Sequence, residues 1–450
     1  MTLTAMRLLL RRTLLAGASF GLVSLDAACA VDETDAAVDD DLTGISPTAI
    51  SDQTIGNCWA YATTQWIQRL HTRVGGRELD LSESYLSYWW SYRQLMFGVG
   101  LNSASALPDV DSNGKAEPFS FQQGNTFGGA RVLLEDYGII QQTHFANDAP
   151  TGSKNPLHAR AISRIGAWLK TGGLKSLPQE RAPRSLAIAQ MLDTAWELPL
   201  ATRSRLDGVF GKNRDRVIGS APVDTFARFQ ILRPQDLSAA IYQPGADKPR
   251  SGILAELVIA GTATSYRMDW VSDGKPAFDR KYDLWLRDDG GPAAVRESQR
   301  RVQRVLHQGL AVWFSFGPNK NAILPGTNTF DRTAGSAAGG SAGAHAVLLY
   351  DYDATLADGT RLAAGVTISD RNLLSRALRP DTTFKFWRIQ NSWGTNPWYA
   401  KLNLLSNGSY DLTEDYLTVP SPVRYTYSDG LPIERPYWYG AALPSNIEMK

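Results

Sequence analysis

Three residues that could form a cysteine nucleophile site occur in order along the chain: Cys58, His345 and Asn391. A thiol is a weak nucleophile until it loses its proton, so it needs a basic partner such as His and an electropositive environment. Asn391 could accept a hydrogen bond from the far ring nitrogen of His345 and fix the imidazole, as Asp does in serine hydrolases. Gln53 could donate its side-chain amide, together with the Cys58 backbone N–H, to a developing oxyanion. The pattern therefore predicts attack of a Cys58 thiolate on a carbonyl carbon.

A helix is expected to carry the thiol. Apolar residues recur at three- and four-residue intervals over residues 59–74, and Gly75-Gly76 then ends the pattern. This spacing predicts an amphipathic helix with Cys58 on its first turn. The unpaired N–H groups and the dipole at a helix N-terminus favour a thiolate.

Two strands are expected to carry the other groups. His345 lies near the start of a strand pattern at 344–350, which follows a Gly/Ala/Ser-rich loop, and Asn391 follows directly on a second pattern at 384–390. The Asn-Ser-Trp-Gly sequence that begins at Asn391 indicates a turn. The sequence thus predicts a site assembled between one helix and two strands.

At these residues the chain resembles the papain-like cysteine peptidases, in which a Gln precedes a Cys-Trp pair and a later Asn opens an Asn-Ser-Trp-Gly turn. The resemblance implies one role for each matching residue: oxyanion donor for Gln53, nucleophile for Cys58, general acid/base for His345 and orienting amide for Asn391. It also implies that Trp59 and Trp393 support the site, Trp393 as the indole that shields the His–Asn hydrogen bond from water. The fold implied is α+β and two-lobed, with a helical lobe and a β-barrel-like lobe.

The chain departs from the family pattern Cys-Gly-Ser/Ala-Cys-Trp. The residues before Cys58 are Ile-Gly-Asn and lack the first cysteine, and Gln53 lies one residue nearer the nucleophile than is usual. Cys58 and His345 are 345 − 58 = 287 residues apart, against roughly 130–150 in the family, so a large insertion is expected. The wide gap and the Ser-Glu-Ser-Tyr-Leu run at 82–86 also resemble the bleomycin hydrolase branch, which trims peptides from the N-terminus.

These features divide the chain into five parts. They are a signal peptide at 1–30, an acidic linker at 31–48, a helical lobe at 49–170, a β-rich insertion at 171–291, and a β lobe with a C-terminal extension at 292–450. The insertion is expected to hold a helix near 186–196 and strands at 226–232, 253–259, 266–271 and 282–287, followed by a helix at 293–308 and a strand at 310–316. We interpret it as an enlarged lobe that narrows the cleft, with a substrate- or partner-binding subdomain as the alternative.

The first thirty residues have the pattern of an export signal. An arginine-containing segment precedes an apolar core at 13–25, and Ala28-Cys29-Ala30 is a small-residue cleavage site. Arg11-Arg12, followed by Thr-Leu-Leu, resembles a twin-arginine signal. This predicts a protein of the bacterial periplasm or the extracellular space, with no integral membrane segment in the mature chain. A lipid anchor on Cys29 is disfavoured because Asp26 stands where such sites usually carry an aliphatic residue.

Composition narrows the functional class. The hydrophobic fraction of 43% can form a sizeable core, and the formal net charge of +1 gives no electrostatic case for binding nucleic acid. Removal of the signal takes away Cys29 and leaves Cys58 as the sole cysteine. A lone thiol in an oxidising compartment cannot be half of an intrachain disulfide, so its presence is best explained by reactivity.

Other candidate motifs are weaker. Residues 109–114 match the opening of a calcium loop, but Ser120 stands at the twelfth position where a bidentate Glu is required, so a polar turn is predicted. The remaining histidines show no metal-ligand spacing and are expected to be surface or core residues: His71, His144, His158 and His307.

The sequence therefore predicts an exported cysteine peptidase that hydrolyses peptide or protein substrates through a thioester and needs no cofactor. One alternative keeps the acyl-enzyme and acts as an amidase or transpeptidase on cell-wall or modified peptides. Another is a catalytically inactive binding module with the same fold, for which the altered spacing of Gln53 is the motive.

Overall fold

The computed structural model describes residues 44–46, 51–101, 121–145, 155–220, 223–270, 291–319, 322–324, 326–331, 344–394, 408–414, 421–426, 432–437 and 440–447. All of them belong to one compact unit, residues 41–450. Four predictions fall wholly or mostly outside the described residues: the export signal, the acidic linker, the calcium-like loop at 109–114 and the strand at 282–287.

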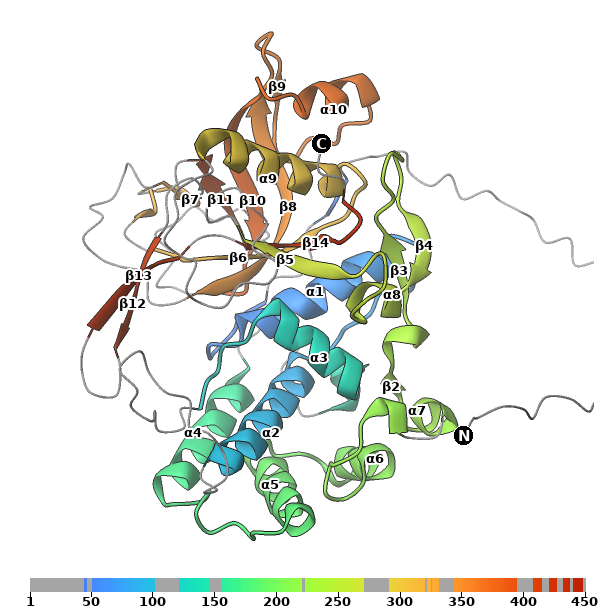
Figure 1. Ribbon diagram of the computed structural model, residues 1–450, viewed down its shortest axis with the longest axis vertical. Coiled ribbons are helices and arrows are strands. Elements are labelled where there is room, and N and C mark those ends of the chain that lie inside the picture. The colour runs from blue at the N-terminus through green and yellow to red at the C-terminus, as the bar shows by residue number, and fades with distance from the viewer. Residues whose placement is uncertain are drawn as a thin grey trace, which may run out of the picture. The chain divides into compact units, whose positions relative to one another are not determined.

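The described residues form an α+β fold (Figure 1). The helices are α1 (Cys58–Thr72), α2 (Glu83–Leu101), α3 (Phe127–Tyr137), α4 (Pro156–Lys170), α5 (Arg181–Ala195), α6 (Leu200–Phe210), α7 (Val223–Phe229), α8 (Ala255–Val258), α9 (Gly291–Leu306) and α10 (Arg371–Ala377). Aromatic side chains join α2, α3 and α6. Trp89 of α2 stacks on Tyr137 of α3, with ring centroids 3.8 Å apart, and meets Phe210 of α6 edge-on.

A mixed eight-stranded sheet forms the other part, in the order β5-β14-β6-β8-β10-β11-β7, with β9 paired to β8. Its strands are β5 (Tyr266–Trp270), β6 (Val312–Phe316), β7 (Thr329–Phe330), β8 (His345–Thr355), β9 (Arg361–Leu362), β10 (Thr383–Gln390), β11 (Ser409–Thr413) and β14 (Gly440–Pro444). The pairings are antiparallel except that of β7 with β11. Three two-stranded sheets pair β1 (Ile139–Ile140) with β2 (Ile231–Leu232), β3 (Ser238–Ile241) with β4 (Arg250–Ile253), and β12 (Ser421–Thr426) with β13 (Pro432–Tyr437).

Helix α1 lies between helices α2 and α3 on one side and the sheet on the other (Figure 1), and it contacts α2, α3, β6 and β8. Trp59 and Trp66 are fully buried on it, and Thr63 accepts a hydrogen bond from the indole of Trp313 on β6 at 3.2 Å. The predicted helix is confirmed: it starts at Cys58, ends two residues before the sequence pattern does, and is followed by Gly75 at φ +77°. The sheet strands predicted at 344–350 and 384–390 are also confirmed as β8 and β10.

Two strand predictions in the insertion are wrong. Residues 226–232 begin inside α7, and only Ile231–Leu232 is a strand. Residues 253–259 are mostly the short helix α8. Both are short apolar runs, and such runs lack the length that separates a buried strand from a buried helical turn. In α7 Phe226 is buried while the two residues after it are exposed, which is a helical and not an alternating pattern.

The label β-rich is consequently wrong for the described part of the insertion, in which helices α5 to α7 come first and the short strands β2 to β4, helix α8 and strand β5 follow. The predicted strand at 266–271 is confirmed as β5, and it pairs along its whole length with β14 in the main sheet. The predicted helix and strand that lead back to the site are confirmed as α9 and β6. Among the described helices, none combines the length and apolar character that crossing a bilayer requires.

Candidate active site

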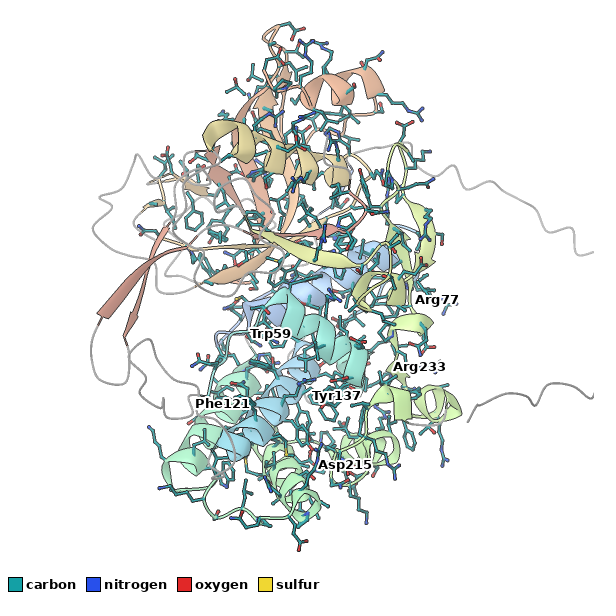
Figure 2. All side chains as sticks on the ribbon, viewed as in Figure 1. Trp59, Arg77, Phe121, Tyr137, Asp215 and Arg233 are labelled. Carbon is teal, nitrogen blue, oxygen red and sulfur yellow. The ribbon has the colours of Figure 1, made fainter. Side chains whose placement is uncertain are left out.

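Cys58 is the first residue of α1 and is buried, with 7% of its surface exposed. Its Sγ accepts a hydrogen bond from the backbone N–H of Ala346 at 3.3 Å. Ala346 directly follows His345, the first residue of β8. The thiol therefore lies against the strand that carries the predicted base, although 288 residues separate Cys58 from Ala346. Trp59, labelled in Figure 2, follows the thiol on the first helical turn.

His345 and Asn391 make the hydrogen bond expected from the sequence. Nε2 of His345 lies 2.7 Å from Oδ1 of Asn391, which directly follows the last residue of β10. The same Oδ1 accepts the backbone N–H of Ser392 at 2.7 Å. A backbone N–H can only donate, so this atom is the amide oxygen and the ring nitrogen facing it must be the donor. In the neutral ring the proton is therefore on Nε2, and Nδ1 carries the basic lone pair.

Aromatic rings cover His345, which is 5% exposed. Trp393 stacks on the imidazole with centroids 4.7 Å apart and planes 28° apart, and Phe316 of β6 meets it edge-on at 5.9 Å. A hydrogen bond in such a water-poor environment is electrostatically stronger than one in solvent. This arrangement corresponds to the shielding that the sequence predicts for Trp393.

Gln53 ties the segment before the nucleophile to the turn that carries Asn391. Its backbone N–H donates to the Ser392 carbonyl at 2.7 Å, and its Oε1 accepts from the Ser392 hydroxyl at 2.5 Å. Its amide nitrogen donates to the Ile55 carbonyl at 3.0 Å. The oxyanion role of Gln53 thus stays a prediction, and it requires the amide nitrogen to exchange Ile55 for the substrate oxygen.

The electrostatics of the thiol differ from the sequence expectation. Burial raises the pKa of Cys58 to about 11, while the backbone N–H groups of Ala346, Trp59 and Cys58 itself lower it by less. The N–H groups at the start of α1 do favour the thiolate, as predicted, but the loss of hydration on burial outweighs them. A thiolate at Cys58 requires a partner that takes the proton.

One contributor to the site is missed by sequence reasoning. The side-chain oxygen of Gln123 accepts a hydrogen bond from the Gly56 N–H at 2.6 Å. The backbone carbonyl of Gln123 accepts one from the indole N–H of Trp59 at 3.0 Å. Gln123 thereby fixes the chain on both sides of Cys58. It lies in a loop 64 residues beyond Trp59, where neither periodicity nor a motif could have indicated it.

The four other histidines are confirmed as surface or core residues. His158 and His307 are buried, and His307 bonds the Tyr352 hydroxyl. His71 is partly exposed and bonds Ser238, and His144 is partly exposed.

No family model and no curated protein matches this chain. Among solved structures, it is similar to the crystal structure of PepW from Lactobacillus rhamnosis HN001 (DR20), determined as the selenomethionine derivative. The TM-score is 0.40 and the identity 15%, over 90% of this chain and 82% of that one. A likeness this weak supports no conclusion about function, so the function has to be argued from the residues of the site.

Proposed function

We propose that this protein is an exported, papain-type cysteine peptidase, in which Cys58 is the nucleophile, His345 the general acid/base and Asn391 the residue that orients the imidazole. One observation carries the proposal. The thiol of Cys58 lies on the backbone of Ala346, beside a histidine whose Nε2 is already engaged by Asn391. A cysteine hydrolase needs these three groups, and here the thiol contacts the strand that begins with the histidine while the histidine contacts the asparagine.

The chemistry follows from the tautomer. Nδ1 of His345 accepts the thiol proton, and the resulting imidazolium compensates the thiolate that burial disfavours. Sulfur attacks the carbonyl carbon, and the oxyanion is stabilised by the Cys58 N–H and, after its amide swings from Ile55, by Gln53. The imidazolium protonates the leaving amine as the C–N bond breaks, which leaves a thioester. Water, deprotonated by the same imidazole, releases the acid and restores the thiol.

The two-lobe architecture and the export signal belong to the same proposal. The helices α1 to α6 are the candidate helical lobe, and the eight-stranded sheet is the candidate β lobe, with α1 between them. Export is supported by the arginine-containing segment, the apolar core and the small-residue cleavage site within residues 1–30.

Treatment with an epoxysuccinyl thiol-protease inhibitor tests the proposal. The reduced protein should gain the mass of one inhibitor molecule, as measured by intact mass spectrometry. Cys58→Ala should gain none, and Asn391→Ala should react more slowly than the wild type. Equal labelling of the wild type and Cys58→Ala, or no reaction of Cys58 with either this inhibitor or a small alkylating agent, would refute a nucleophilic Cys58 and favour the inactive binding module.

Product analysis separates the peptidase from the acyl-transfer alternative. The peptidase should yield free acid from a peptide mixture, even when an amine acceptor is added. Formation of transfer products alone would contradict the hydrolase and support an amidase or transpeptidase with the same thioester. Cys58→Ala again serves as the control, because both reactions need the thiol.

A further inference from the structure

A buried polar cluster lies behind the nucleophile, outside the groups assigned to the proposed reaction. It comes from the residue before α1 and from α2 and α4, and no member is more than 5% exposed: Asn57, Ser84, Ser87, Asn155 and His158. Buried polar groups are costly unless they are hydrogen-bonded, so a cluster of this size next to a candidate active site needs an explanation.

His158, on the first turn of α4, is the centre of the cluster. Its Nδ1 lies 3.0 Å from the amide nitrogen of Asn57, and its Nε2 lies 2.5 Å from the Ser84 hydroxyl. The Asn57 amide also donates to Ser87 at 3.1 Å. Because the Asn57 amide nitrogen donates to Nδ1, the ring proton is on Nε2 and donates to Ser84. Burial lowers the pKa of His158 to about 3, so the ring is neutral near pH 7.

The cluster is not a second catalytic site. Ser84, His158 and Asn57 resemble a hydrolytic triad by residue type, but His158 is 0% exposed and Ser84 is 1% exposed. A substrate carbonyl has no access to the Ser84 hydroxyl. The ring is also enclosed by Trp196, which meets it edge-on at 5.5 Å, and by Tyr61 at 6.3 Å. The cluster can therefore influence the proposed reaction only through the residues to which it is hydrogen-bonded.

One of these residues, Asn57, directly precedes the nucleophile. Asn57 is the N-cap residue of α1, a position where Asn normally accepts a hydrogen bond from an N–H of the first turn. Here the side chain makes no capping bond and points to His158 instead. The residue before α4 makes a second contact with the loop that precedes Cys58. Its carbonyl, that of Asn155, accepts a hydrogen bond from the Thr54 hydroxyl at 2.8 Å.

We propose that His158 is a positioning residue for the proposed reaction: it holds Asn57 in the interior and thereby fixes Cys58, the next residue, and its N–H in the geometry for attack. The inference rests on the proposed function. An error of about 1 Å in such geometry can cost 10²-fold in rate. The network also keeps the Asn57 side chain away from the N–H groups of Cys58 and Trp59, which can then stabilise negative charge on the sulfur or the oxyanion.

Two substitutions at one position test this role. His158→Phe keeps the ring and its packing against Trp196 but cannot accept from Asn57. His158→Gln can present an amide oxygen to Asn57 and an amide nitrogen to Ser84. We expect His158→Phe to lower the maximal inactivation rate of Cys58 by the epoxysuccinyl inhibitor roughly 10- to 100-fold, with the inhibitor's dissociation constant unchanged. His158→Gln should restore most of the rate.

A double mutant tests the route through Asn57. Asn57→Ala should slow inactivation, and adding His158→Phe should cause no further loss, because both changes break one connection. The inference would be overturned if the rate losses of the two single variants multiplied in the double mutant. A wild-type inactivation rate in His158→Phe would also overturn it, as would a rate loss that His158→Gln, at matched thermal stability, fails to restore. If His158→Phe does not fold, Asn57→Ala and His158→Gln still decide it: a wild-type rate in Asn57→Ala overturns it. If Cys58 of the wild-type protein reacts with neither the inhibitor nor a small alkylating agent, the proposed function is refuted instead.

Discussion

At the scale of single residues, Asn391 connects the two sides of the candidate site. Its one oxygen accepts both the His345 ring N–H and the Ser392 backbone N–H, and its side chain is buried. The first bond fixes the tautomer of the base, and the second fixes the turn from which the amide projects. Removal of this oxygen takes away the acceptor of two buried donors. The cost in stability then includes the free energy of burying those donors without this hydrogen bond.

Asn391→Ala should therefore reduce both stability and reactivity. We expect a loss of about 1–3 kcal/mol in the free energy of unfolding, measured by urea denaturation, and a slower inactivation of Cys58. Asn372→Ala is the matched control, because Asn372 is exposed on α10. An Asn391→Ala protein with the stability and inactivation rate of that control would contradict the orienting role.

At the scale of elements, sequence patterns predicted the correct helix or strand where the pattern was long or chemically specific. The spacing over 59–74 predicted α1, and the strands β8 and β10 were predicted with the residues that they present to the site. The patterns failed for α7 and α8, which are each too short to show a helical period.

The candidate site was predicted to the same extent. Cys58, His345 and Asn391 carry their proposed chemistry in their side chains, so residue type and order were enough to propose them. Gln123 and His158 act through contacts with Gly56, Trp59 and Asn57 that depend on how distant segments pack. No local sequence pattern indicates such contacts. In the sequence, a histidine that positions another residue therefore cannot be distinguished from any other buried histidine.

Two glycines, one after α1 and one inside α4, allow the effect of backbone conformation on stability to be measured without a change in packing. Gly75 follows α1 at φ +77° and Gly166 lies within α4; an added Cβ meets nothing within 4 Å at either position. Gly75→Ala should destabilise by about 1–2 kcal/mol because the left-handed conformation is strained for alanine. Gly166→Ala should stabilise by about 0.5–1 kcal/mol because alanine loses less backbone entropy in a helix. Urea denaturation measures both, and equal signs for the two variants would contradict this account.

At the scale of the whole molecule, stability should depend on a carboxylate far along β8 from the site. Burial raises the pKa of Asp351 to about 6, although the Gly365 and Tyr352 N–H groups lower it. A raised carboxyl pKa means that the folded state binds the proton more tightly. The stability that this group contributes is therefore complete below about pH 4, its ordinary pKa, and is lost as the pH rises through about 6.

Asp351→Asn should remove this dependence, because an amide does not ionise. We expect its free energy of unfolding to fall less between pH 4 and about 6 than that of the wild type, as measured by denaturation at each pH. Asp381→Asn serves as control, because Asp381 forms an exposed ion pair with Arg379. Wild-type and Asp351→Asn curves that run parallel across this interval would exclude Asp351 as the source.

The place of β14 in the sheet sets the order in which the protein can become reactive during synthesis. Residues 440–444 lie between β5 and β6, and β6 in turn borders the strand that begins with His345. A ribosome that has made α1 has already released the thiol, but the residues that complete its surroundings emerge several hundred codons later. A growing chain consequently carries an unassembled cysteine, and the proposed peptidase cannot become reactive before the strands that position His345 and Asn391 have been made.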